Sequence, residues 1–251
     1  MSEPENQNVD DENQRLRDQY LEVSELAGSL AHEIKNPLSV ILMNMDLLAE
    51  DLGEAENQRE RRCLKTIEIV QTQCQRLQNL LDDFLRFIRV NKIDLKAGNL
   101  NDQIQHVLDF VAPKARETQI EIYPSLDADL PSVLMDAPRL YAALLNLVLN
   151  AMEALQDSGG SFWVHTRRTP TGVAMDLIDN GCGMDSEALI HVFEPFYTTK
   201  ENGSGLGLPT ARRIIEAHDG RIAVRSALGR GTQFTLEFPT PPRLTSEEAS
   251  A

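Results

Sequence analysis

The sequence predicts an α+β protein in which an N-terminal antiparallel helical hairpin precedes a two-layer α/β sandwich. Three observations support this fold class. Apolar residues recur at steps of three and four over residues 16–51 and again over 59–90, as they do on one face of a helix. Gly53 lies in the short stretch between these runs, which is typical of a turn. After Asn91, helical patterns alternate with short strand-like runs, and this favours helices layered on a largely antiparallel sheet.

The first expected helix spans residues 16–51 and carries an imperfect apolar row. Pro37 and Asn44 interrupt this row, which consists of Val23, Ala27, Leu30, Ile34, Pro37, Ile41, Asn44 and Leu48. Because a proline has no backbone N–H, we expect Pro37 to kink the helix locally. Residues 1–15 are acidic, amide-rich and nearly free of apolar side chains, so we expect them to form a disordered leader.

The second expected helix spans residues 59–90 and has a cleaner row. Its heptad positions are Cys63, Ile67, Val70, Cys74, Leu77, Leu81, Phe84 and Ile88. A single hairpin offers these rows too little apolar partner surface. We therefore expect two hairpins to pair as a four-helix bundle, which makes the protein a homodimer. The alternative is a hairpin that packs on the second domain of its own chain.

The region after Asn91 is expected to alternate helices and strands. The helices cover residues 101–117, 137–157 and 208–218, and the strands cover 119–123, 161–167, 172–178, 220–226 and 232–238. A long irregular span precedes Gly207. We therefore expect a hairpin domain over residues 16–93, a second domain over 94–240, and a Pro- and Ser-containing tail over 241–251.

Composition limits the partners and the compartment. The net charge of −15 argues against nucleic acid as a ligand, because phosphate backbones are bound by concentrated Lys and Arg. Residues 59–96 carry nine Lys and Arg against five Asp and Glu, which suits either an acidic partner or a solvated helix face. No signal peptide is visible, and polar residues interrupt the longest apolar stretch, 140–155, so no membrane span is expected. Cys63, Cys74 and Cys182 lack metal-ligand spacing and predict a reducing cytoplasm.

A histidine-containing string in the first helix suggests nucleophilic chemistry. The string LAHEIKNP begins at Leu30. If Leu30 and Ile34 face the bundle seam, His32 points outward and Asn36 lies one turn away on the same face. Imidazole offers a nucleophilic nitrogen near neutral pH, and Glu33 can accept its ring proton. A lone surface histidine more often has no function, so the whole string carries the signal.

Three further motifs suggest a nucleotide site, although no Walker P-loop is present. The glycine-rich run GSGLGL, residues 203–208, opens an expected helix whose free N–H groups favour phosphate oxygens. Asp179 follows an apolar strand and can accept the exocyclic amine of adenine, where guanine has a carbonyl. Asn146 and Asn150 share one helical face and can meet a hydrated Mg²⁺. Each motif alone also has a purely structural explanation. The glycine-rich run can be an ordinary loop, the Asp179 motif a tight turn, and the two amides can be satisfied by neighbouring backbone groups.

Taken together, these strings resemble the two-component sensor histidine kinases. The HExxNP string at His32 resembles their phosphoacceptor box. Later strings resemble the boxes of the GHKL type of ATP-binding domain, which these kinases share with gyrase and MutL. The N box matches residues 146–151, the G1 box 179–183, the F box 193–200 and the G2 box 203–208, and residues 229–234 resemble the closing strand. The wording of the N and F boxes resembles the nitrogen-regulation subclass.

The resemblance implies roles for individual residues. His32 would receive the phosphoryl group, with Glu33 as its base, Asn36 near the transferred group, and Asn150 as the ligand of Mg²⁺. The residues that it places around ATP are Asn146, Asn150, Asp179, Gly181, Gly183, Thr198, Thr199, Lys200, Gly203, Ser204, Gly205, Leu206, Gly207, Leu208 and Thr232.

Two departures from the family pattern affect this interpretation. ATP-hydrolysing relatives have a glutamate that activates water at the position of Asn146. An amide cannot act as a base, so we expect the phosphate to be kept for His32. Relatives often have an aromatic or basic residue where this chain has Glu153 and Ala154, and we therefore assign neither residue a nucleotide role. Residues 184–204 resemble the mobile lid of the family.

The predicted activity is that of a protein histidine kinase. ATP-dependent autophosphorylation is followed by phosphotransfer to an aspartate of a response-regulator receiver domain, with phosphatase activity toward that regulator. Residues 16–93 would be the dimerisation and histidine phosphotransfer domain, and 94–240 the ATP-binding catalytic domain. The expected cofactors are ATP and Mg²⁺, and the expected partners are a second copy, the receiver domain and an upstream sensory protein. The alternatives are a non-catalytic nucleotide-binding scaffold and a pure ATPase of the gyrase type.

Overall fold

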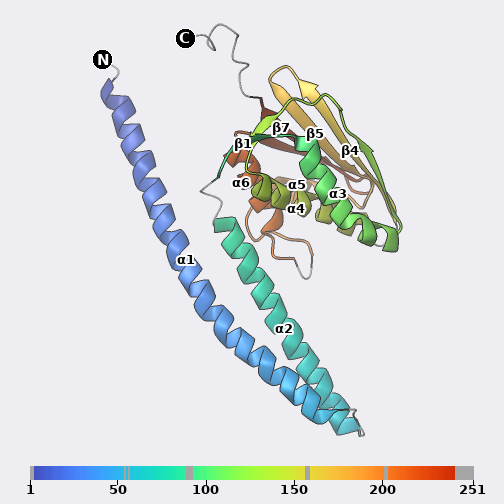
Figure 1. Cartoon of the computed structure of the whole chain (residues 1–251). Coiled ribbons are helices and arrows are strands. Elements are labelled where there is room, and N and C mark those ends of the chain that lie inside the picture. The colour runs from blue at the N-terminus through green and yellow to red at the C-terminus, as the bar shows by residue number, and fades with distance from the viewer. Residues whose placement is uncertain are drawn as a thin grey trace. The chain divides into compact units, whose positions relative to one another are not determined.

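The protein consists of a helical hairpin and a mixed α/β domain (Figure 1). The computed structural model describes residues 3–53, 55, 57–88, 93–155, 159–200 and 203–240, with side chains from residue 27 onward. The chain divides into two compact units after Asn91. The predicted fold class is therefore confirmed.

The first unit is the hairpin of α1 (Glu3–Leu52) and α2 (Gln58–Ile88). Polar contacts between the helices pair residue numbers that run in opposite directions, among them Lys35 with Asp82, Ser39 with Gln78, and Asp46 with Gln71. The helices are therefore antiparallel, as the short connection between them requires.

The turn between α1 and α2 has the local chemistry of a helix stop followed by a helix start. Gly53 adopts φ +52°, a left-handed conformation that costs glycine little. Asn57 then caps α2, because its Oδ1 accepts the backbone N–H groups of Arg59 and Glu60 at 3.0 Å each.

The hairpin packs with a different face of α1 from the one that we expected. Ala31 and Leu38 are buried, whereas Leu30 is 59% exposed and Ile34 is 42% exposed. We call the exposed large apolar residues of the expected row the α1 outer row; they are Leu30, Ile34, Ile41 and Leu48. Steps of three and four define a stripe wide enough for two neighbouring rows. The small side chain of Ala31 lets the row beside the expected one lie in the interface.

The expected row of α2 is closer to the observed one. Ile67, Cys74 and Ile88 are buried, in agreement with the heptad pattern. Leu77 of the same row is 52% exposed and Cys63 is exposed as well. Each helix of the hairpin thus leaves large apolar side chains uncovered within one chain.

Helix α1 begins at Glu3, where we expected a disordered leader up to residue 15. The sequence of this segment is compatible with a helix, because it contains no glycine. Its one proline, Pro4, falls in the first turn, where a missing N–H costs no intrahelical hydrogen bond. The helix also runs on through Pro37.

The second unit is built on a five-stranded sheet with strand order β2-β4-β5-β7-β6. Its strands are β2 (Ile120–Ser125), β4 (Gly160–Thr169), β5 (Gly172–Asp179), β6 (Arg221–Ser226) and β7 (Thr232–Pro239). Strand β2 pairs parallel with β4, and the other pairs are antiparallel. The helices that pack on one face of this sheet are α3 (Leu100–Glu117), α4 (Ala137–Leu155) and α6 (Gly207–Ala217) (Figure 1).

The core lies between this sheet and the three helices. Alternate residues of the central strands point toward the helices and are fully buried, among them Phe162, Val164, Met175 and Leu236. The facing residues of α4 are equally buried, among them Leu140, Leu144, Leu147 and Val148. Burial alternates along β4 and β7, whereas β5 is buried on both faces from Gly172 to Leu177.

Three short elements were not expected from the sequence. Strands β1 (Lys96–Gly98) and β3 (Val133–Met135) form a separate antiparallel pair. Helix α5 (Ser186–His191) interrupts the span that we expected to be irregular, and Asp185 caps it by accepting the Ala188 N–H at 2.8 Å. Strands of three residues are too short to show alternation, and a six-residue helix completes fewer than two turns, so a periodic pattern cannot identify these elements.

A buried histidine fixes α4 relative to α6. His218 is 3% exposed and lies just after α6. Its Nε2 accepts the backbone N–H of Asp136 at 2.9 Å, so its Nδ1 carries the proton and donates to the Ile214 carbonyl at 2.6 Å. Since Asp136 immediately precedes α4, this contact sets the relative positions of the two helices that carry the N and G2 boxes.

Candidate functional site

The carboxylate of Asp179 is buried at the end of β5. Asp179 is 5% exposed, and its Oδ1 accepts the backbone N–H groups of Gly181 at 2.9 Å and Thr232 at 3.2 Å. No residue in the described part of the chain donates to its Oδ2. Burial raises the pKa of Asp179 above its ordinary value, and the two hydrogen bonds only partly oppose this shift. One oxygen is therefore fixed by the backbone, and the other is available to a donor such as an exocyclic amine.

Gly181 and Gly183 form a turn after Asp179 that has no room for side chains. A Cβ at Gly183 would lie 2.1 Å from the carbonyl oxygen of Ala227, and one at Gly181 would lie 2.6 Å from that of Ala154. Gly183 also has φ +66°, which favours glycine. These two glycines are therefore required by the packing of the turn that presents Asp179.

The glycine-rich loop leads into α6, which begins at Gly207. Gly205 has φ +66°, and its carbonyl accepts the N–H of Phe196 at 3.0 Å, so the F box and the G2 box are joined through the backbone. Leu206, the residue before the helix, makes no side-chain capping hydrogen bond. The first N–H groups of a helix have no intrahelical partner, so this uncapped end can donate to phosphate oxygens.

The other expected nucleotide residues of this loop differ in exposure. Leu206 is buried, so its side chain belongs to the hydrophobic core on which the loop packs. Thr198 Oγ1 accepts the Lys200 N–H at 3.1 Å, and Ser204 Oγ accepts the Leu206 N–H at 3.3 Å. Thr199 is exposed, Leu208 is half-buried, and a Cβ at Gly203 would lie 2.4 Å from Thr198 Oγ1.

Asn146 and Asn150 lie one turn apart on α4 and contact residues of the G2 box and the F box, respectively. Asn146 Nδ2 donates to the Gly207 carbonyl at 3.5 Å. Asn150 Oδ1 accepts from Lys200 Nζ at 2.7 Å, and Lys200 also forms an ion pair with Glu153. The N box is thus in direct contact with the start of α6 and with the end of the F box.

The surroundings of Asn150 are compatible with Mg²⁺. Its amide oxygen already faces a cation, because the ammonium of Lys200 donates to it. Nowhere in the described ranges do three or more His, Cys, Asp or Glu residues gather so that they could hold a metal ion. A metal at Asn150 would therefore have few protein ligands and would depend on phosphate and water oxygens, which Mg²⁺ accepts readily.

His32, Glu33 and Asn36 lie on the exposed surface of α1, in the first unit. None of the three side chains forms a hydrogen bond or an ion pair with another residue that the structure describes. His32 is thus accessible, and Glu33 does not hydrogen-bond it in this structure. Asn36 does not satisfy a backbone group near Pro37.

Two residues with clear structural roles around the site were missed by sequence reasoning. Glu153 pairs with Lys200, and the available signal was its position on the same face of the helix as Asn150, with a lysine at the end of the F box. Ser226 Oγ accepts the Met184 N–H at 2.8 Å and donates to the Gly231 carbonyl at 2.9 Å. It thereby joins the G1 turn to the closing strand, and no motif pointed to it.

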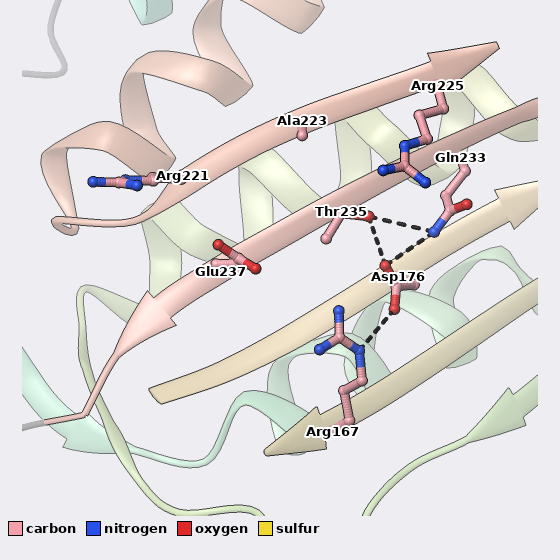
Figure 2. Close-up of a pocket in the computed structure, with 8 residues that line it drawn as sticks. All are labelled: Arg167, Asp176, Arg221, Ala223, Arg225, Gln233, Thr235 and Glu237. Atoms are coloured by element: carbon pink, nitrogen blue, oxygen red, sulfur yellow. Dashed lines mark hydrogen bonds and ion pairs between the residues drawn. The ribbon is translucent and has the colours of Figure 1, made fainter. Parts of the chain in front are cut away.

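A pocket of about 330 Å³ lies on the sheet face opposite the helices (Figure 2). Apart from Ala223, its lining is polar and charged: Arg167, Asp176, Arg221, Arg225, Gln233, Thr235 and Glu237. Asp176 accepts from Thr235 at 2.6 Å, Gln233 at 3.2 Å and Arg167 at 3.3 Å. Burial alone would raise the pKa of Asp176, but these partners outweigh it and hold the pKa below its ordinary value. None of the expected nucleotide residues lines this pocket.

Two family models match the chain. Residues 22–93 match the His Kinase A (phospho-acceptor) domain, and residues 135–242 match the Histidine kinase-, DNA gyrase B-, and HSP90-like ATPase. In the described residues no helix has both the length and the apolar character that crossing a membrane requires.

Known sensor histidine kinases are similar to most of this chain. It is 33% identical over 228 residues to the sensor histidine kinase ZraS of Escherichia coli (strain K12), which is 90% of this chain and 47% of ZraS. The chain therefore spans about half the length of the curated relatives that it matches first.

Solved structures of histidine kinases are similar as well. Full-length ShkA in complex with AMPPNP has a TM-score of 0.69 at 28% identity, over 86% of this chain and 46% of ShkA. ThkA in complex with the response regulator TrrA has a TM-score of 0.64 at 26% identity, over 94% of this chain and 67% of that one. The ThkA catalytic domain alone is 33% identical with a TM-score of 0.54, over 59% of this chain and 100% of that domain.

The nitrogen-regulation subclass stays a prediction, since these matches do not distinguish it from the other subclasses of histidine kinases. The two matched domains occur in the order that the sequence boxes predict, and one relative is covered completely at 33% identity. This chain belongs to the family of two-component sensor histidine kinases.

Proposed function

We propose that this protein transfers the γ-phosphoryl group of ATP to His32 and then passes it to an aspartate of a response-regulator receiver domain. The observation that carries the proposal is the state of Asp179, whose Oδ1 is fixed by two backbone N–H groups while its Oδ2 is left to a ligand. A buried acceptor of this kind suits the exocyclic amine of adenine. Guanine has a carbonyl at that position and would be repelled.

The phosphates of ATP would lie between α4 and the start of α6. The uncapped first turn of α6 offers backbone N–H groups, and the helix dipole adds positive potential there. Asn150 would hold Mg²⁺, which supplies charge neutralisation and orientation of the phosphates when bound. Thr198, Thr199 and Lys200 belong to a segment that meets α4 through Asn150, and this supports their expected place near the phosphates.

At His32, one ring nitrogen would attack the γ-phosphorus in line with the bond to the β-phosphate oxygen. That P–O bond breaks, and ADP leaves with the electron pair. Glu33 would take the proton from the other ring nitrogen, so the phosphohistidine is neutral at the ring. The exposure of His32 on α1 supports this role, because the nitrogen has to reach a nucleotide held by another domain.

Transfer to His32 is favoured over loss of phosphate to water by the residue at position 146. Asn146 Nδ2 donates to the Gly207 carbonyl, and an amide cannot remove a proton from water. This speaks against the pure ATPase alternative. The accessible His32 and the open Oδ2 of Asp179 speak against the alternative of a scaffold without transfer.

The partners follow from the hairpin and from the relatives. The α1 outer row leaves four large apolar side chains exposed on one helix, and a second copy of the hairpin is the natural cover for them in a four-helix bundle. ThkA was solved in complex with a response regulator, which supports a receiver domain as the phosphate acceptor here. An upstream sensory protein remains part of the proposal, and nucleic acid does not.

We place residues 16–93 in the dimerisation and phosphotransfer domain and residues 94–240 in the ATP-binding domain. The tail, 241–251, lies outside the described residues. Cys63, Cys74 and Cys182 are free thiols, which supports a reducing compartment such as the cytoplasm.

The test is incubation with γ-labelled ATP and Mg²⁺, comparing the wild type with His32→Gln. Label that is acid-labile and base-stable, and that disappears in the variant, is the expected result. Release of labelled phosphate without labelled protein would instead indicate an ATPase. Nucleotide binding with neither product would indicate a scaffold.

A further inference from the structure

Lys200 and Glu153 form a charge pair at the amide that is expected to hold Mg²⁺. Lys200 Nζ donates to Asn150 Oδ1 at 2.7 Å and pairs with the carboxylate of Glu153. Asn150 and Glu153 are three residues apart on α4, so they offer one ammonium group two adjacent oxygens on the same helix face. The pairing joins the end of the F box to the N box.

The backbone around Lys200 is fixed well enough to aim this side chain. Its N–H donates to Thr198 Oγ1 at 3.1 Å, and its carbonyl accepts the N–H of Gly203 at 3.2 Å. The side chains of Lys200 and Glu153 are 46% and 54% exposed. The pair is therefore placed by the local turn, yet it is accessible enough to be exchanged for another cation.

An ammonium group and Mg²⁺ exclude each other at this amide oxygen. Mg²⁺ binds oxygen at about 2.0–2.1 Å, and the Lys200 ammonium lies 2.7 Å from the same atom. Two cations on one oxygen would lie within about 5 Å of each other and repel. Metal entry at Asn150 therefore requires the Lys200 ammonium to leave that oxygen.

We propose that Lys200 is a built-in cation that occupies the metal position on Asn150 when nucleotide is absent, and that Glu153 is the positioning residue that holds it there. This inference rests on the proposed function, because it takes Asn150 as the metal ligand. Binding of Mg²⁺ with nucleotide displaces the ammonium from Asn150, and the phosphates and Glu153 then compete for it. Glu153, to which the sequence assigned no role, thereby acts on the nucleotide site through Lys200.

The measured quantity is the benefit of metal to nucleotide binding. For each protein, the Kd of a fluorescent, non-hydrolysable ATP analogue is measured in EDTA and in saturating Mg²⁺. The metal benefit is the Kd in EDTA divided by the Kd in Mg²⁺. Lys200→Met removes the ammonium that metal must displace, so it raises this ratio about two- to fivefold, the range for an exposed ion pair. Any loss of phosphate binding by Lys200 in EDTA raises the ratio further.

Three variants make the result specific. Lys200→Arg keeps a cation and leaves the metal benefit near the wild-type value. Lys114→Met removes an exposed lysine on α3 and leaves the ratio unchanged. Glu153→Gln, measured alone and together with Lys200→Met, completes a double-mutant cycle in which the two changes are coupled by about two- to fivefold.

The outcomes separate the inference from the function on which it rests. A metal benefit that is unchanged or lower in Lys200→Met, with normal binding of the analogue, overturns the inference and leaves the nucleotide site intact. Zero coupling in the cycle shows that Glu153 does not hold Lys200. Failure of the wild type to bind the analogue at all overturns the proposed function and the inference with it.

Discussion

Asp179 Oδ1 accepts the backbone N–H of Thr232 at 3.2 Å, across the pairing of β5 with β7. This contact joins the G1 box to the closing strand. It also fixes which oxygen of the carboxylate is used by the protein and which is left for a ligand. The two residues are far apart in the sequence and come together because the last strand of the chain is inserted beside β5.

Asp179→Asn is expected to weaken ATP binding by about 1–3 kcal/mol. The amide presents a donor toward the adenine amine, or it loses the bonds to Gly181 and Thr232 if it turns. Isothermal titration calorimetry measures the affinity. The matched control is Asp176→Asn, three residues earlier in β5 on the opposite sheet face, which should leave ATP affinity unchanged. Equal affinities of wild type and Asp179→Asn, at equal melting temperature, would place the adenine pocket elsewhere.

Asp176→Asn is instead expected to lower the stability of the second unit by about 1–3 kcal/mol near neutral pH, because its hydrogen-bond partners lose a charged acceptor. The folded-state pKa of Asp176 lies below the ordinary 3.8, so the ionised group adds stability above pH 3.8. That stability is lost as the pH falls through the folded pKa. Urea unfolding at several pH values should show the difference between wild type and variant shrinking below pH 3.8. A pH-independent difference would contradict the assignment.

Asn150→Ala is expected to abolish Mg²⁺-dependent labelling of His32, because the expected metal ligand is removed. The hairpin does not contain Asn150, so the assembly state should not change. The measurements are labelling with γ-labelled ATP and light scattering. Wild-type labelling by this variant would make Asn150 a structural amide.

Ile41→Glu together with Leu48→Glu is expected to dissociate the homodimer without unfolding the hairpin. Both side chains belong to the α1 outer row and are exposed within one chain, so the charges harm only the contact between copies. The contrasting variant is Ile67→Ala, which removes a side chain buried within the hairpin and should cost about 2–5 kcal/mol of stability. Light scattering and thermal unfolding distinguish the two effects. A monomeric wild type would remove the four-helix-bundle proposal.

Asn36→Ala is expected to lower dephosphorylation of the response regulator while labelling of His32 largely survives. Asn36 lies one turn from His32 on the exposed face of α1 and has no partner among the described residues, so its amide is available to hold a water molecule near the phosphorus. The measurement is decay of the purified phospho-regulator. Because Asn36 bonds to no backbone group near Pro37, the melting temperature should not change. Equal decay rates from equally stable proteins would exclude this role.

Much of the architecture could be predicted from local patterns. The two long helices, the Gly53 turn and the main strands follow from residues that are near neighbours in the chain, and period and turn chemistry are local properties. The position of Asp179 at the end of an apolar strand was predictable for the same reason. The order of the boxes in the sequence was sufficient to indicate the family.

The tertiary structure alone decided which atoms meet. The apolar pattern of α1 allowed two neighbouring rows, and packing against α2 selected the row with Ala31 and Leu38 and left Leu30 and Ile34 exposed. The parallel pairing of β2 with β4 and the contact of Lys200 with Asn150 and Glu153 also escaped sequence reasoning. Such contacts join residues that are remote in the chain. Their formation depends on strand order and helix packing, because these bring distant segments together. Local sequence propensities do not predict such long-range contacts.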